Sequence, residues 1–152
     1  MEGAMMPQVP GGMLGSRTVP DPSPLELADK RRLLYGKGLD AERAAVVKAL
    51  VGKGRLAEAL EILDRTKDAA SLGQVRKDAV RAGDLFSLVR SCQILKVDAD
   101  PAELRELAGI AERAGRFYDA VNALARAGDA EASEALRQAK CPDFQPFKPA
   151  NK

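Results

Sequence analysis

The sequence predicts an all-α fold, a short α-solenoid of about three antiparallel helical hairpins with flanking helices. One phrase occurs three times, a glycine followed by a charged and then an apolar residue: Gly54-Arg55-Leu56, Gly83-Asp84-Leu85 and Gly115-Arg116-Phe117. The glycines lie 29 and 32 residues apart, and repeats of that length form stacked helical hairpins. Aromatic residues make up only 4% of the chain and Trp is absent. The Ala- and Leu-rich segments between the glycines suit closely packed helices.

The chain divides into three parts. Residues 1–22 contain four Met, four Pro and four Gly, which predicts a disordered N-terminal arm because they bury little apolar surface. The helical-repeat domain is expected over residues 23–140. It begins with Ser23-Pro24-Leu25-Glu26, a capping box with proline at the first helical position, and the first helix should end near Tyr35. Residues 141–152 form a C-terminal tail that contains Pro and Phe.

The first hairpin is predicted to begin near Asp40, a candidate helix cap. Its first helix ends at Gly52 and Gly54. The apolar positions that share a face of this first helix are Leu39, Val46, Val47, Leu50 and Val51. Those of the return helix are Leu56, Ala59, Leu60 and Leu63. Both sets follow the spacing of an amphipathic helix.

The second and third hairpins have the same organisation. The apolar stripe of the second comprises Leu72, Val75, Ala79 and Ala82, followed by Leu85, Leu88, Val89, Cys92 and Leu95. The third opens with a second capping box, Asp100-Pro101-Ala102-Glu103. Its stripe comprises Leu104, Leu107, Ala108 and Ala111, followed by Phe117, Ala120, Val121 and Leu124. Gly128 should end it, and residues 130–140 should form a final short helix.

The residue types present argue against catalysis and metal binding. The chain has no His, which removes the commonest general base and metal ligand. Its two cysteines are too few and too far apart for a zinc site. We expect Cys92 to be a buried thiol and Cys141, beside Pro142, to be an exposed one. Two lone cysteines favour a reducing compartment, so we expect a cytoplasmic protein without cofactors.

The charge of the chain indicates a binding partner only locally, through its uneven distribution. The formal net charge is +2, which offers no bulk electrostatic reason for nucleic-acid binding. Residues 70–97 nevertheless carry a net charge of +3, and residues 98–136 a net charge of −5. This uneven distribution could steer a partner, or it could reflect ordinary solvated helix faces. No apolar run approaches the length of a membrane span.

The third hairpin resembles a tetratricopeptide repeat. The resemblance lies in the alternation of large and small residues at Leu104, Leu107, Ala108, Ala111, Gly115, Phe117, Ala120, Leu124 and Ala127. The first hairpin matches less fully, and the second has Arg76 where the family has a small residue and Leu88 where Ala is usual. The spacings fall short of that family's 34 residues. Short, degenerate repeats of this type also resemble the α-solenoids of coat and intraflagellar-transport proteins.

The resemblance implies a peptide-binding groove lined by the first helix of each hairpin. Transferred by register, this protein-binding groove would present Lys48, Val51, Gln74, Lys77, Arg81, Arg105, Glu112 and Arg113. Most of these residues are basic, so an acidic segment of a partner is the implied ligand. The family's carboxylate clamp is not reproduced, because Ala44, Ala102 and Glu106 occupy its positions.

The tail offers a second candidate contact. Pro142, Pro146 and Pro149 prevent a helix there, yet the tail holds Phe144 and Phe147. These rings either dock on the domain or serve as a peptide motif for a partner.

Three functions follow, in decreasing order of support. The first is a non-catalytic protein–protein interaction adaptor or assembly subunit that uses a helical-repeat surface to bind an acidic segment or a larger complex. The second is an RNA-binding helical-repeat protein that uses the basic middle hairpin, where Phe86 alone could stack on a base. The third is an enzyme using paired carboxylates, Glu103 with Glu106 or Glu58 with Glu61, although such pairs are common on solvated helices.

Overall fold

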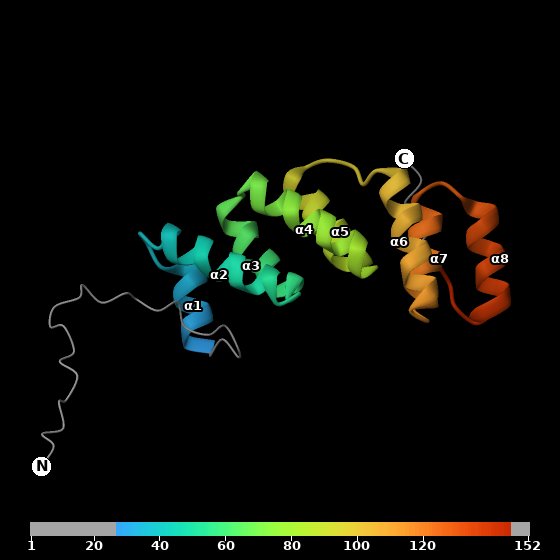
Figure 1. The fold of residues 1–152 in the computed structure, drawn as a ribbon, viewed down its shortest axis with the longest axis horizontal. Helices are drawn as coiled ribbons and strands as arrows, with labels where there is room; N and C mark the ends of the chain where they lie inside the picture. The colour runs from blue at the N-terminus through green and yellow to red at the C-terminus, as the bar shows by residue number, and fades with distance from the viewer. Residues whose placement is uncertain (1–26, 147–152) are drawn as a thin grey trace, which may run out of the picture.

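The computed structural model describes residues 27–146, and the described chain is entirely helical (Figure 1). Its eight helices are α1 (Leu27–Tyr35), α2 (Asp40–Gly52), α3 (Leu56–Thr66), α4 (Ala69–Ala82), α5 (Leu85–Leu95), α6 (Pro101–Arg113), α7 (Phe117–Arg126) and α8 (Ala130–Lys140). The predicted arm and the capping box at residues 23–26 lie outside the described residues. The expected ends of the first and last helices, at Tyr35 and residue 140, are confirmed.

The helices pack mainly against their neighbours in the sequence. α2 packs on α3, α4 on α5, and α6 on α7, and α7 also packs on α8. The first helices contact each other in turn, α2 with α4 and α4 with α6, while α3 contacts both α1 and α5. Figure 1 shows an elongated arrangement with α1 near one end and α8 at the other. The described helices therefore form an elongated row.

The turn glycines end their helices in the same way. Gly54, Gly83 and Gly115 have φ angles of 71°, 64° and 76°, in the left-handed region where a Cβ atom is unfavourable. After each of them, the next backbone N–H donates to the carbonyl five residues earlier, at 2.8–2.9 Å. This is the Schellman arrangement, which satisfies carbonyls that the helix leaves open. Gly128, with φ 81°, repeats it before α8.

The predicted apolar stripes form the core, with one error. Nineteen of the predicted positions are buried, for example Leu50, Ala79 and Leu107, all 0% exposed. Ala82 was predicted to be buried and is exposed, whereas Val80 is 5% exposed. Val80 is buried because α4 contacts α2, α3, α5 and α6, so its buried stripe is wider than a single hairpin contact requires.

The helix caps differ from the sequence prediction at two positions. Asp40 is the first residue of α2, and the N-cap is Leu39, whose side chain cannot cap. The Asp40 carboxylate instead lies 3.1 Å from the guanidinium of Arg43, which also donates to the carbonyls of Leu33 and Gly36. Arg43 therefore occupies the C-terminal end of α1, where helix carbonyls are open and cations are favoured.

The predicted capping box of α6 is half formed. The Asp100 side chain accepts a hydrogen bond from the backbone N–H of Ala102 at 2.8 Å, with Pro101 at the first helical position. Glu103 does not return to the cap. Its carboxylate lies 2.6 Å from the guanidinium of Arg76 in α4. The interaction raises the pKa of Arg76 through its hydrogen bond with Glu103. Arg76, which departs from the repeat signature, thus links α4 of the second hairpin to α6 of the third.

Cys92 is a core thiol, as predicted. It is 3% exposed in α5, and burial raises the pKa of its thiol, which makes the reactive thiolate scarce. Among the described residues, no helix combines the length and apolar content needed to cross a membrane.

Candidate protein-binding surfaces

The residues predicted to line a groove lie on the three first helices, which touch one another in order. Lys48 and Val51 belong to α2, Gln74, Lys77 and Arg81 to α4, and Arg105, Glu112 and Arg113 to α6. All are exposed except Val51, which is half-buried against the core. We call this set the first-helix surface. None of its members lines the hollows described below.

Three of the five cations of the first-helix surface have no ion pair within the described part of the chain. Lys48, Lys77 and Arg113 form no ion pair with the described residues. Arg81 is 74% exposed and 3.6 Å from Asp78, and Arg105 is 3.9 Å from Asp129. Elsewhere, the guanidinium–carboxylate pairs that join different helices are closer, 2.6 Å for Arg76 with Glu103 and 2.9 Å for Arg90 with Asp64.

A second surface lies over α1, α3, α5 and α7 and carries exposed aromatic rings. The side chains of Tyr35, Phe86 and Tyr118 are 67%, 65% and 60% exposed. We call it the aromatic surface. Phe86 separates two hollows of about 330 and 250 Å³, one reaching Tyr35 and the other reaching Asp119. Both hollows are open to solvent, so the rings are accessible to a partner.

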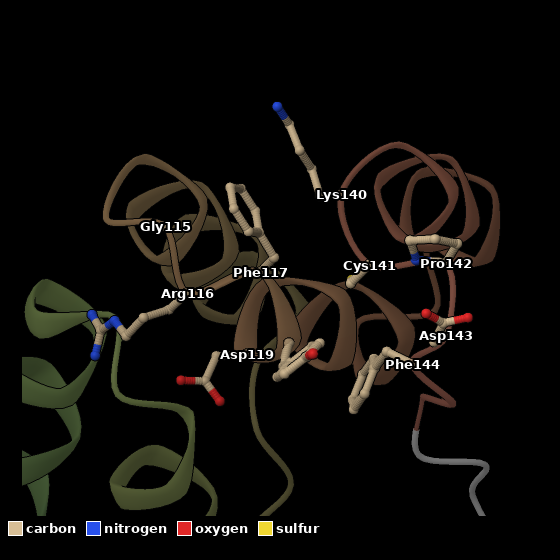
Figure 2. A pocket seen from close by; sticks show the side chains of 10 residues that line it. Gly115, Arg116, Phe117, Asp119, Lys140, Cys141, Pro142, Asp143 and Phe144 are labelled. Atoms are coloured by element: carbon tan, nitrogen blue, oxygen red, sulfur yellow. The ribbon is translucent and has the colours of Figure 1, made fainter.

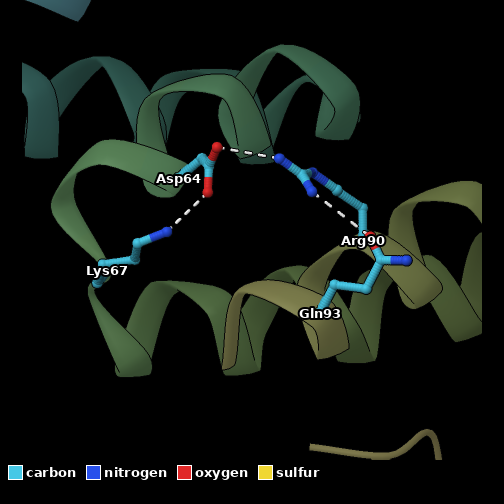
Figure 3. Close-up of polar contacts among 4 residues, drawn as sticks. All are labelled: Asp64, Lys67, Arg90 and Gln93. Atoms are coloured by element: carbon cyan, nitrogen blue, oxygen red, sulfur yellow. Dashed lines mark hydrogen bonds and ion pairs between the residues drawn. The ribbon is translucent and has the colours of Figure 1, made fainter. Parts of the chain in front are cut away.

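Polar contacts between α3 and α5 fix Asp64 and Arg90, which line the hollow between Tyr35 and Phe86. Asp64 at the end of α3 accepts from Lys67 at 2.7 Å and from Arg90 of α5 at 2.9 Å, and Arg90 also donates to Gln93 at 3.4 Å (Figure 3). The hydrogen bond from Lys67 lowers the pKa of the Asp64 carboxyl, and the charge of Arg90 adds to the effect. These contacts fix Arg90 one turn beyond Phe86, on the same face of α5.

The tail is docked at one end of the aromatic surface. The ring of Phe144 stacks on that of Tyr118, with centroids 4.5 Å apart and planes 27° from parallel. Together they line a hollow of about 620 Å³ between the start of α7 and the chain after α8 (Figure 2). Of the two open interpretations of the tail, docking is therefore the one found for Phe144. Phe147 lies outside the described residues.

Docking also corrects the prediction for Cys141. The thiol was expected to be exposed, but the residue is only 8% exposed, because the chain turns back there. The backbone N–H of Phe144 donates to the Cys141 carbonyl at 3.0 Å, and Arg137 of α8 donates to the carbonyl of Pro142. Lys140 lies 5.6 Å above the ring of Phe117.

The guanidinium that holds the tail is itself held by a carboxylate. Arg137 donates to both oxygens of Glu134, at 2.6 and 2.8 Å, and Gln138 adds a third hydrogen bond. The hydrogen bonds from Arg137 and Gln138 lower the pKa of Glu134 from 4.5 to about 2. This bidentate geometry orients the group that contacts Pro142.

A pH titration should detect this arrangement. Because the folded-state pKa is lowered, the Glu134 interaction stabilises the fold above pH 4.5, and this contribution should disappear as the pH falls from 4.5 to about 2. We expect an NMR titration of the side-chain carboxyl to give a midpoint near 2. In Arg137→Gln the midpoint should rise toward the ordinary glutamate range. A midpoint that is ordinary in the parent would show that the bidentate pair does not persist in solution.

Three of the four carboxylates considered for catalysis form ion pairs. Glu103 is paired with Arg76, Glu58 with Arg55 at 2.6 Å, and Glu61 with Lys30 at 2.6 Å. Glu106 is exposed. The described residues contain no group of three His, Cys, Asp or Glu side chains that could hold a metal ion.

Comparisons with protein-family models, with curated proteins and with solved structures found no match.

Sequence reasoning did not find the aromatic surface, although a signal was present. Phe86 and Tyr118 are each the third residue after a turn glycine, and Ala57 is the equivalent residue of the first hairpin. The structure places all three on the exposed side of their helices. An aromatic residue at an exposed repeat position is the pattern that would have indicated this surface.

Proposed function

We propose that this chain is a non-catalytic adaptor or assembly subunit, whose hairpins form a short α-solenoid and whose first-helix surface binds an acidic segment of another protein. The open, elongated arrangement of helix pairs supports a scaffold role. Extended repeat surfaces of this kind typically hold peptides and other proteins.

One observation carries the proposal. Cations of three adjoining helices project from the first-helix surface without close carboxylate partners among the described residues, as shown above for Lys48, Lys77 and Arg113. Arginine and lysine side chains that are not neutralised within the fold remain available to acidic groups of a partner. The position of Lys77 and Arg81, four residues apart on α4, places both on one side of the middle hairpin.

Reversing both charges should abolish partner capture. We expect Lys77→Glu/Arg81→Glu to lose partners recovered by affinity purification and mass spectrometry, with unchanged helicity because both residues are exposed. Arg31→Glu/Lys37→Glu, which changes two exposed cations of α1 and the turn after it by the same charge, is the matched control and should retain them. Captured partners should also be released by added salt, since exposed charge contacts are screened over about 8–10 Å.

The outcomes separate the candidate functions. Recovery that disappears on nuclease treatment would favour the RNA-binding alternative. In that case, the exposed Lys77 and Arg81 of the basic middle hairpin would contact RNA phosphates. Equal recovery by the parent and the charge-reversed variant, with unchanged salt sensitivity, would contradict a role for the first-helix surface.

A further inference from the structure

The first helices of the three hairpins share one register, which the turn glycines define. In all three, the positions four and eight residues before the turn glycine are buried: Leu50 and Val46 in α2, Ala79 and Val75 in α4, Ala111 and Leu107 in α6. The position six residues before the glycine therefore lies on the opposite side of each helix, away from the core. This position is Lys48 in α2, Lys77 in α4 and Gly109 in α6.

The glycine of α6 leaves this position open to a neighbouring side chain. Arg113 follows Gly109 by one helical turn, and its Nη1 atom lies 3.5 Å from the place that a Cβ atom of residue 109 would take. The guanidinium of Arg113 thus lies in α6 where Lys48 and Lys77 project from α2 and α4. Each of the three adjoining helices contributes one cation at an equivalent level. We call Lys48, Lys77 and Arg113 the cation row.

The cation row is accessible to a partner. Its three residues are exposed, and none of them forms an ion pair with the residues that the structure describes. Asp78, next to Lys77 in the sequence, accepts a hydrogen bond from Gln74 at 3.0 Å and lies 3.6 Å from Arg81. Five cations against Glu112, its one acid, give the first-helix surface a net charge of +4. An acidic ligand is the complement of this charge.

Helix packing sets the distance between neighbouring cations of the row. Packed helices have axes about 8–10 Å apart, and α2 contacts α4 as α4 contacts α6. A polyproline II segment has three residues per turn and rises about 3.1 Å per residue, so side chains on one side recur at about 9 Å. In a β-strand they recur at about 6.6 Å, which does not match the row. An α-helix matches only at every seventh residue, about 10.5 Å.

We propose that the cation row binds an acidic segment in polyproline II conformation, with a carboxylate at every third residue. This inference rests on the proposed function and specifies the form of its ligand. About seven residues of such a segment reach all three cations, whereas an α-helix would need about fifteen. Pro-rich segments adopt this conformation before binding, so they lose less conformational freedom. Because each carboxylate meets a cation of a different helix, the spacing of the acids determines affinity as well as their number.

The experiment compares two end-capped peptides of the same composition and charge, by NMR titration of the isotope-labelled full chain at low salt. The spaced peptide, Asp-Pro-Pro-Asp-Pro-Pro-Asp-Pro-Pro, has an acid at every third residue. The control peptide, Pro-Pro-Asp-Pro-Asp-Pro-Asp-Pro-Pro, has one at every second. We expect the spaced peptide to bind about threefold more tightly or better, since each exposed ion pair contributes only modestly. It should shift the amide signals around Lys48, Lys77 and Arg113.

Single substitutions test each member of the row. Lys48→Gln, Lys77→Gln and Arg113→Gln should each weaken the spaced peptide by about twofold or more. Arg105→Gln is the matched control, because this exposed cation of α6 lies one turn before Gly109 and faces the turn before α8. It should bind as the parent does. Gly109→Leu keeps every charge but fills the place of the Arg113 guanidinium, so it should weaken binding as Arg113→Gln does. Circular dichroism checks that each variant is folded.

The outcomes separate this inference from the proposed function. Equal binding of the two peptides, abolished by Lys77→Glu/Arg81→Glu, would overturn the spacing and leave the acidic ligand in place. No binding of either peptide at millimolar concentration would contradict both. Tighter binding of a helical peptide with an acid at every seventh residue would contradict the extended form. Tighter binding of single-stranded oligouridylate, lost in the same variants, would identify RNA phosphates as the ligand and overturn the acidic segment.

Discussion

Ala120→Glu should lower the free energy of unfolding by about 3–5 kcal/mol, the cost of leaving a buried charge without a partner. Ala120 is 0% exposed and lies in α7. The contact of α7 with α6 is the most extensive between two helices of the described chain, and α7 also packs against α8. A glutamate at this position must either lose its water shell or force the helices apart.

The matched control is Ala44→Glu in α2. Ala44 is exposed, and Lys48 follows it by four residues, an orientation in which Glu and Lys stabilise a helix slightly. We therefore expect its urea midpoint to lie within experimental error of the parent's. Ala120→Glu should be largely unfolded or should melt far below both. If Ala120→Glu melts with the parent, the register assigned to the third hairpin is wrong.

The core could be predicted because helical periodicity is a local property. Leu50, Ala79 and Ala111 each fall on an apolar stripe that the sequence shows without any knowledge of the neighbouring helices. All three are 0% exposed. The turn glycines were equally informative, because a residue at positive φ that ends a helix is strongly biased toward Gly.

The sequence-based predictions are wrong where contacts between residues far apart in the sequence determine the structure. The burial of Cys141 depends on the return of the chain along α7, which places Phe144 on Tyr118, a residue 26 positions away. The local sequence around Pro142 does not indicate that Tyr118 is the ring on which Phe144 docks. Similarly, Glu103 pairs with Arg76 on another helix instead of its expected cap, because the guanidinium adds the attraction of an opposite charge that a backbone amide lacks.

The candidate surfaces differ in how far the sequence could indicate them. The first-helix surface follows from register alone, since residues such as Lys77 and Arg81 must face away from a core formed by Leu72 and Val75. The aromatic surface needs the lateral packing of α3, α5 and α7, because its hollows lie between helices of different hairpins. Repeat spacing places Phe86 on an exposed position but does not reveal the hollows beside it.

Gly83→Ala should lower the free energy of unfolding by about 2–5 kcal/mol, from two separate causes. The first is the left-handed backbone, φ 64°, which costs a residue with a Cβ atom about 1–2 kcal/mol. The second is space. A Cβ atom at Gly83 would lie 3.1 Å from the backbone nitrogen of Ala111 and 3.2 Å from a methyl group of Ile110. Overpacking of this kind typically costs about 1–3 kcal/mol.

Gly54→Ala separates the two causes. Gly54 has nearly the same backbone, φ 71°, but a Cβ atom there would meet nothing within 4 Å, so only the backbone cost of about 1–2 kcal/mol is expected. Chemical denaturation of both variants gives the difference, which measures how tightly the α4–α5 turn packs on α6. Arg116 of the next hairpin donates to the carbonyl of Ala82 beside this turn, which holds the two hairpins at close range. Equal losses in the two variants would show that the turn does not pack closely against α6 in solution, and that backbone conformation alone explains glycine at both positions.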